Sequence, residues 1–83
     1  MRLPRDLSGD DLVGHLKVFG YKVTRQTGSH VRLTTLEQGQ HHITIPRHKP
    51  LRIGTLAAIL TDIASHFDLS REELGEQLFG KGK

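Results

Sequence analysis

The chain has no cysteine, few aromatic residues and no long apolar run. Without cysteine it can form no disulfide, zinc–thiolate site or thiol nucleophile, which fits a reducing cytoplasm. No apolar run reaches the roughly 18 residues that a membrane-spanning helix needs, and the start of the chain holds no apolar stretch of signal-peptide length. The three phenylalanines and the one tyrosine fit the core positions of helices and strands. We therefore expect no aromatic platform for stacking single-stranded bases.

Length and charge indicate one small domain with an uneven surface. We treat residues 1–83 as a single domain, because a chain of this size with 35% hydrophobic residues can build only one thin core. The net charge is only +3, but the lysines and arginines gather between His15 and Arg52, whereas carboxylates gather between Asp62 and Glu76. A basic middle favours a polyanionic partner there.

Hydrophobic periodicity predicts an α-β-β-β-α order followed by a short helix. Ser8 with Asp11 and Ser70 with Glu73 each have the spacing of a capping box, and Gly20 is a good helix stop. We expect Thr55 to cap the second helix and Ile53 to lie on its buried stripe. The predicted fold class is α+β, like a double-stranded-RNA-binding domain, with helices on one face of a three-stranded antiparallel sheet. The expected elements are a helix at about 8–19, strands at about 21–26, 31–36 and 41–45, a helix at about 54–67 and a short helix at about 71–79.

Alternation along the three strands predicts one apolar and one polar face. This assignment assumes that no strand contains a bulge, since one extra residue would flip part of it. The apolar face should hold Tyr21, Val23, Val31, Leu33, Thr35, Ile43 and Ile45. The polar, basic face should hold Lys22, Thr24, His30, Arg32, Thr34, His42 and Thr44.

The tripeptide Gly28-Ser29-His30 lies between the first two strands. Glycine allows a tight turn there. Histidine has an unperturbed pKa of about 6.5, so it can both take and give a proton near neutral pH. A histidine at the end of a strand on an open polar face is suited to general acid–base catalysis. A surface histidine beside a turn is also common without any role, so the tripeptide alone does not define a site.

The order and spacing of several segments resemble the HicA (YcfA-like) toxin family of mRNA interferases from toxin–antitoxin pairs. The resemblance implies a double-stranded-RNA-binding-like fold, ribosome-independent cleavage of mRNA, and a HicB-like antitoxin that covers the active face. It maps the key catalytic histidine of the family onto His30. Many members have a further histidine or aromatic residue where this chain has Val31 and Arg32, and the chain is longer from Ser65 onward. The segments are Leu12 to Gly20, Gly28-Ser29-His30, Ile43 to His48, Gly54-Thr55-Leu56 and Ile59-Leu60.

Cleavage of RNA with His30 as general base would need further groups nearby. His48 or His42 could protonate the leaving oxygen, and Arg47 or Lys49 could neutralise the phosphate. Ser29 either orients His30 or donates to a phosphate, or it simply shapes the turn. We expect no cofactor and no metal, because the adjacent His41 and His42 point to opposite faces of a strand. The candidate RNA-binding residues are Ser29, Lys22, Thr24, Arg32, Arg47, His48 and Lys49.

Two alternative functions remain open at this level. A non-catalytic RNA-binding module on the same fold would bind RNA in a salt-dependent way without cutting it. A small interaction protein would instead dock an acidic protein on the basic face. The family resemblance favours the endoribonuclease toxin over both.

Overall fold

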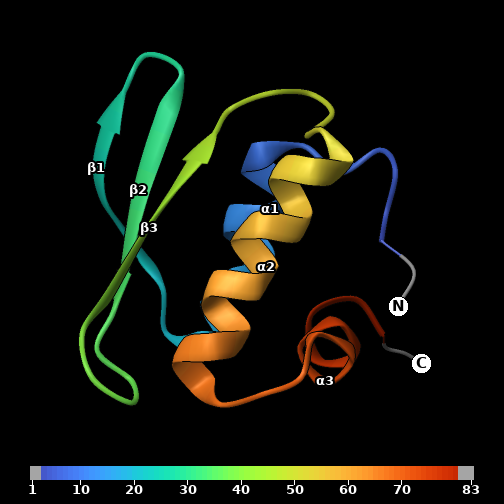
Figure 1. Cartoon of the computed structure of the whole chain (residues 1–83). Helices are drawn as coiled ribbons and strands as arrows, with labels where there is room; N and C mark the ends of the chain where they lie inside the picture. The colour runs from blue at the N-terminus through green and yellow to red at the C-terminus, as the bar shows by residue number, and fades with distance from the viewer. Residues whose placement is uncertain (1–2, 81–83) are drawn as a thin grey trace.

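A computed structural model describes residues 3–80, so both ends of the predicted domain, residues 1–2 and 81–83, lie outside the described part. The described chain contains three strands, three α-helices and two short helical extensions (Figure 1). In chain order these are α1 (Gly9–His15), the 3₁₀ helix η1 (Leu16–Phe19), β1 (Lys22–Thr27), β2 (His30–Thr35), β3 (His41–Pro46), α2 (Ile53–Phe67), α3 (Arg71–Gly75) and the π-helix η2 (Glu76–Gly80).

The strands form one antiparallel sheet in the order β1-β2-β3, and the helices lie on one side of it (Figure 1). The predicted α+β fold class is therefore confirmed. Two short turns set this meander: Gly28 and Ser29 join β1 to β2, and Gln38 and Gly39 lie in the loop before β3. Gln38 and Gly39 both have positive φ, at 60° and 97°, which suits the twist of a tight hairpin. Gly28 has no positive φ, so the first turn does not depend on glycine's conformational freedom.

Local capping explains where the helices begin and end. Ser8 Oγ accepts from the Asp11 amide at 3.0 Å, and the Asp11 carboxylate accepts from the Ser8 amide at 3.1 Å. Ser70 and Glu73 make the same reciprocal pair before α3. Such caps each stabilise a helix by about 1 kcal/mol. Gly20 ends the first helical segment with φ of 80°. Both predicted capping boxes and the Gly20 stop are thus confirmed.

The core lies between the sheet and the helices, and most predicted apolar positions are buried in it. Leu12, Leu16, Leu56 and Leu60 are fully buried. Burial of one such leucine side chain contributes roughly 1.5–3 kcal/mol. Thr35 is a buried polar residue of the inner sheet face, and its hydroxyl donates to the Phe19 carbonyl at 2.8 Å. The residues of the sheet buried against the helices are Val31, Leu33, Thr35, Ile43 and Ile45, and Tyr21, which directly precedes β1, is buried with them.

Three sequence-based expectations about individual residues are wrong. Val23 and Ile53 are each 48% exposed instead of buried. Val23 lies on the edge strand β1, all of whose residues are exposed, and Ile53 is the first residue of α2 and lines a surface hollow. Thr55 does not cap α2, because the cap position is Arg52, which makes no side-chain capping bond.

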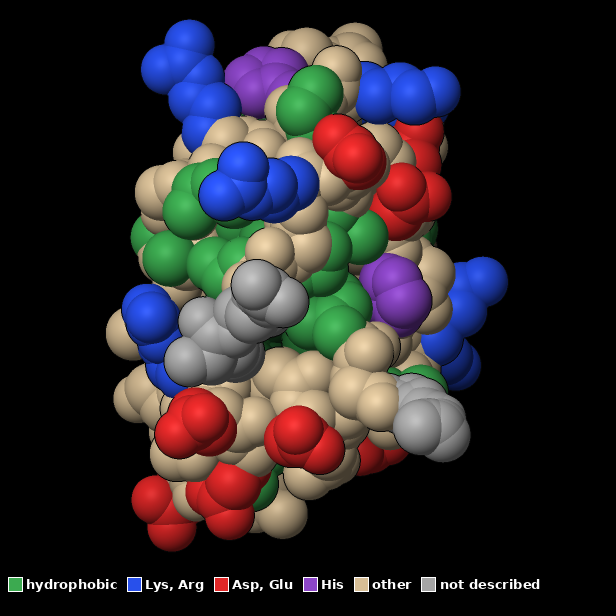
Figure 2. All heavy atoms as spheres, turned by 90° about the vertical axis from the view of Figure 1, so that its right-hand side faces the viewer, with side chains coloured by type: hydrophobic (Ala, Val, Ile, Leu, Met, Phe, Trp, Pro, Cys, Tyr) green, Lys and Arg blue, Asp and Glu red, His purple; other side chains and the backbone are tan. Residues whose placement is uncertain are grey.

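Charge is unevenly distributed on the helical side of the molecule. Figure 2 shows this side, with many carboxylates gathered at its lower end, where α3 lies, and with lysines and arginines at its upper end and mid-height, where some carboxylates lie among them. Apolar side chains fill much of the area between. None of the helices in residues 3–80 is long and apolar enough to cross a bilayer.

Candidate functional site

His30 begins β2 directly after the turn and is exposed on the outer, uncovered face of the sheet. Its Nδ1 lies 3.0 Å from the Ser29 hydroxyl. When that hydroxyl accepts the Nδ1–H, the lone pair of the neutral ring is on Nε2. Nε2 is then the nitrogen that can take a proton from a substrate. The geometry is consistent with Ser29 orienting His30.

The turn that carries His30 is fixed to two other segments. Pro46, at the end of β3, is the register partner of His30. The Arg47 amide then donates to the Ser29 carbonyl at 2.7 Å. Gly9 packs against the same strand end so closely that a Cβ there would meet the Pro46 carbonyl oxygen at 2.2 Å. The start of α1, the end of β3 and the turn therefore form one frame under His30.

A hollow of about 540 Å³ lies beside this turn, and both signs of charge line it. The Arg47 guanidinium contacts the Asp10 carboxylate through Nε at 3.2 Å and Nη2 at 3.3 Å. Lys49 contributes to lowering the pKa of Asp11, which falls chiefly because the Ser8 amide and hydroxyl donate to its carboxylate. Carboxylates from α1 thus offset part of the predicted basic loop. The lining residues are Ser8, Asp10, Asp11, Gly28, Ser29, Arg47, His48 and Lys49.

A bulge in β1 changes which residues share the outer face with His30. Val23 pairs with Leu33 and Arg25 with Arg32, so Thr24 is the extra residue. The Thr24 hydroxyl bonds the Thr34 hydroxyl at 3.0 Å. Beyond the bulge, Arg25 lies on the outer face. Strict alternation had placed it on the inner face, so the sequence reading missed it.

The remaining outer-face candidates lie farther along the strands. Lys22 and His42 are register partners of Thr34, four residues from His30 on β2. At about 3.3 Å per residue this separation is roughly 13 Å, too far for His42 and His30 to act on the same phosphate. The His42 Nδ1 instead bonds the Thr34 hydroxyl at 2.7 Å. Of the two histidines considered as the acid, only His48 lines the hollow beside the turn.

A second histidine cluster lies on the inner face, where sequence reasoning assigned no role. His41 Nε2 is 3.2 Å from the Asp62 carboxylate, and His41 Nδ1 is 2.6 Å from the Tyr21 hydroxyl. Because a carboxylate only accepts, Nε2 of the neutral ring carries the proton and Nδ1 accepts from the tyrosine. Burial, followed by the charge of Asp62, raises the pKa of Tyr21. His66 stacks on His41 with ring centroids 4.4 Å apart.

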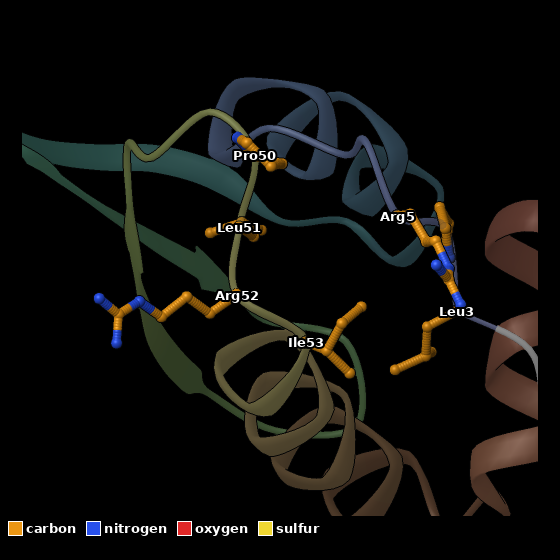
Figure 3. A pocket seen from close by; sticks show the side chains of 7 residues that line it. Leu3, Arg5, Pro50, Leu51, Arg52 and Ile53 are labelled. Carbon is orange, nitrogen blue, oxygen red and sulfur yellow. The ribbon is translucent and has the colours of Figure 1, made fainter.

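A wider hollow, of about 950 Å³, lies away from His30 at the start of α2. Figure 3 shows Leu3 and Ile53 pointing toward one another across it, while Arg52 points away. Its lining combines apolar side chains with two arginines, and it contains no histidine or carboxylate. It therefore offers no acid–base group. Among residues 3–80, no group of three or more potential metal-ligating side chains converges.

These features define an α+β domain whose helices cover one face of the sheet and leave a polar, histidine-bearing face open. Residues 9–64 match the model of the family described as the HicA toxin of bacterial toxin–antitoxin. The chain belongs to the HicA toxin family, which confirms the resemblance, and membership implies a cognate antitoxin partner. Both α3 and η2 lie beyond the matched residues. Neither the search of curated proteins nor the search of solved structures returned a match.

Proposed function

We propose that this toxin is an mRNA endoribonuclease in which His30 acts as the general acid–base group. The observation that carries the proposal is the exposed His30 ring, held at Nδ1 by Ser29 on the open sheet face. Family membership supports it, since the segments that match the family include the turn. A HicB-like antitoxin would then act by covering this face, and the substrate would be cytoplasmic mRNA.

The proposed reaction uses the 2′-hydroxyl of the RNA as its nucleophile. His30 Nε2 takes the 2′-hydroxyl proton, the 2′-oxygen bonds to phosphorus, and the bond from phosphorus to the 5′-oxygen breaks. The products are a 2′,3′-cyclic phosphate and a 5′-hydroxyl, once the leaving oxygen has taken a proton. This route requires no metal, and acid–base help typically contributes 10²- to 10⁴-fold, as an order of magnitude.

Other residues have supporting roles in this proposal. His48 is the better candidate for the acid because it lines the hollow that also contains Ser29. Arg47 and Lys49 lie in the same hollow, and positive charge there would stabilise the developing negative charge on the phosphate. Lys22, Thr24 and Arg32 would contact phosphates along the strand without reading the bases.

The test is cleavage of a single-stranded RNA by purified wild-type protein, His30→Ala and His42→Ala. His42 is the matched control, because it is also an exposed histidine on the outer face but sits about 13 Å away. We expect His30→Ala to lower the rate by about 10²- to 10⁴-fold, and His42→Ala to change it little. An RNA with a single 2′-deoxy nucleotide should resist cleavage at that position, and the products should end in a cyclic phosphate.

The same experiment in cells tests the toxin role. Induced wild-type protein should stop growth and deplete mRNA on a gel, whereas His30→Ala should fold and do neither. Intact RNA with the wild-type protein, together with salt-dependent binding, would support the non-catalytic RNA-binding module instead. Equal activity of wild type and His30→Ala would remove His30 from the mechanism.

A further inference from the structure

Arg25 and Arg32 face each other across β1 and β2 on the outer sheet face. The bulge at Thr24 produces this pairing. Like charges directly opposite in an antiparallel pair destabilise a sheet. Within residues 3–80, neither guanidinium has an ion pair or a side-chain hydrogen bond with a carboxylate. The fold therefore contains an unneutralised pair of arginines, a feature that costs stability.

A small hollow lies at this arginine pair. Its volume is about 170 Å³, several times the roughly 30 Å³ that one water molecule takes up in the liquid. All three strands line it, and each lining group has a donor suited to an anion when His30 is protonated. The lining residues are Arg25, Thr27, His30, Arg32 and Thr44.

The arginine pair differs from the basic loop after β3 in having no carboxylate of the described residues beside it. Arg47 is held by the Asp10 carboxylate, and Lys49 lies near enough to Asp11 to contribute to lowering its pKa. Positive charge in that loop is therefore partly offset within the molecule. At Arg25 and Arg32 no carboxylate of residues 3–80 offsets the charge, so this exposed pair is open to an anionic ligand.

We propose that Arg25 and Arg32 clamp one backbone phosphate of the RNA, next to the phosphate that His30 addresses. Two guanidinium groups can each bind phosphate oxygens in a bidentate fork. Arg32 is two residues from His30 on the same face, which is about 6.6 Å along the strand. A phosphate between the arginines would thus lie beside the imidazole and hold the strand in register there. This inference rests on the proposed function for the choice of RNA as ligand.

The experiment measures binding apart from cleavage. Wild type, Arg25→Gln, Arg32→Gln and the control Lys17→Gln, an exposed lysine of η1 outside this hollow, are titrated with a fluorescent 2′-O-methyl oligoribonucleotide. This probe has no 2′-hydroxyl and cannot be cut by the proposed route. Each arginine variant should bind about tenfold more weakly and reduce the slope of log K against log salt by about 0.7. Lys17→Gln should change neither quantity.

Thermal unfolding gives a second readout, in which the arginine variants should gain stability although they lose affinity for RNA. Removing one arginine relieves the repulsion, so Arg25→Gln should melt about 1–4 °C higher at low salt. Inorganic phosphate should raise the melting temperature of wild type more than that of the variant. Arg25→Lys keeps the charge but loses the fork, so it should retain the salt slope and lose part of the affinity.

The outcomes separate the two proposals. If wild type fails to cut RNA but the arginine variants bind the probe as expected, the endoribonuclease proposal is wrong and the phosphate clamp stands. If wild type cuts RNA with His30 but Arg25→Gln binds with unchanged affinity and slope, the clamp is wrong. Equal weakening by Lys17→Gln, or no binding of the probe by wild type, also overturns the clamp.

Discussion

Replacing Tyr21 by phenylalanine tests the inner-face cluster with the smallest change available. The ring, which is 2% exposed, keeps its packing, and only the hydroxyl that contacts His41 Nδ1 at 2.6 Å is lost. A hydrogen bond of this kind contributes about 1 kcal/mol, and a partner left unpaired and buried raises the loss toward about 3 kcal/mol. The His41 side chain is only 17% exposed. We therefore expect Tyr21→Phe to lower the free energy of unfolding by about 1–2 kcal/mol at neutral pH.

The same substitution should change the alkaline pH dependence. The pKa of Tyr21 is raised above 10.0 in the folded protein, chiefly by burial. Above pH 10 the unfolded chain loses the tyrosine proton while the folded chain keeps it. The unfolded state then binds fewer protons, so stability falls as pH rises from 10 toward the folded pKa. The slope from this group is at most about 1.4 kcal/mol per pH unit.

Urea unfolding of both proteins from pH 7 to pH 11 measures the effect. Tyr21 is the one tyrosine of the chain, so Tyr21→Phe lacks this term entirely while every lysine titrates in both proteins. The stability advantage of wild type should shrink above pH 10 and vanish about one pH unit higher. Parallel stability curves across this range, or a tyrosinate absorbance midpoint near 10 in folded protein, would refute the reasoning.

Three further predictions concern single positions. Asp11→Ala should destabilise the protein at neutral pH, and the difference from wild type should disappear in acid. The pKa of Asp11 is lowered in the folded protein, so its ionised carboxylate stabilises the fold at neutral pH and this stabilisation is lost as the pH falls through the folded pKa. Chemical unfolding at pH 7 and in acid measures this difference. Gly9→Ala should lower the free energy of unfolding by about 1–3 kcal/mol, because the new Cβ would meet the Pro46 carbonyl oxygen. Gly28→Ala should melt like wild type, because a Cβ at Gly28 would have no neighbouring atom within 4 Å. Equal melting temperatures of the two variants would contradict this contrast. Leu60→Ala should cost about 2–5 kcal/mol in urea unfolding, since the side chain is fully buried, and a loss under 1 kcal/mol would place Leu60 outside the core.

The spacing of apolar residues, every second residue in strands and about every 3.6 residues in helices, was sufficient to predict the fold, because burial of one face enforces this spacing. Val31, Leu33, Ile43 and Ile45 lie where alternation placed them, since β2 and β3 are covered by helices on one face. Alternation failed at β1, an exposed edge strand, where no packing penalty opposes a bulge.

Only part of the candidate site could be predicted from the sequence, because several of its contacts join residues that are far apart in the chain. His30 and Ser29 are neighbours in sequence, so their contact could be anticipated. The contact between Arg47 and Asp10 spans 37 residues, and the one between His41 and Asp62 spans 21. Such pairs depend on tertiary packing, which local periodicity does not specify. Alternation did put His41 on the inner face with Ile43, and that was the one signal for the inner cluster.

The bulge in β1 has a consequence for how this strand can vary over evolutionary time. Thr24 is unpaired in the ladder, and Arg25 already stands opposite Arg32. Deletion of the Thr24 codon would therefore leave a regular ladder with the same residues facing each other on either side. An edge strand of this kind absorbs the gain or loss of one codon without reversing the faces of the residues that follow. Insertions and deletions among homologues should accordingly concentrate at this position of the strand and spare the residues from Arg25 to His30.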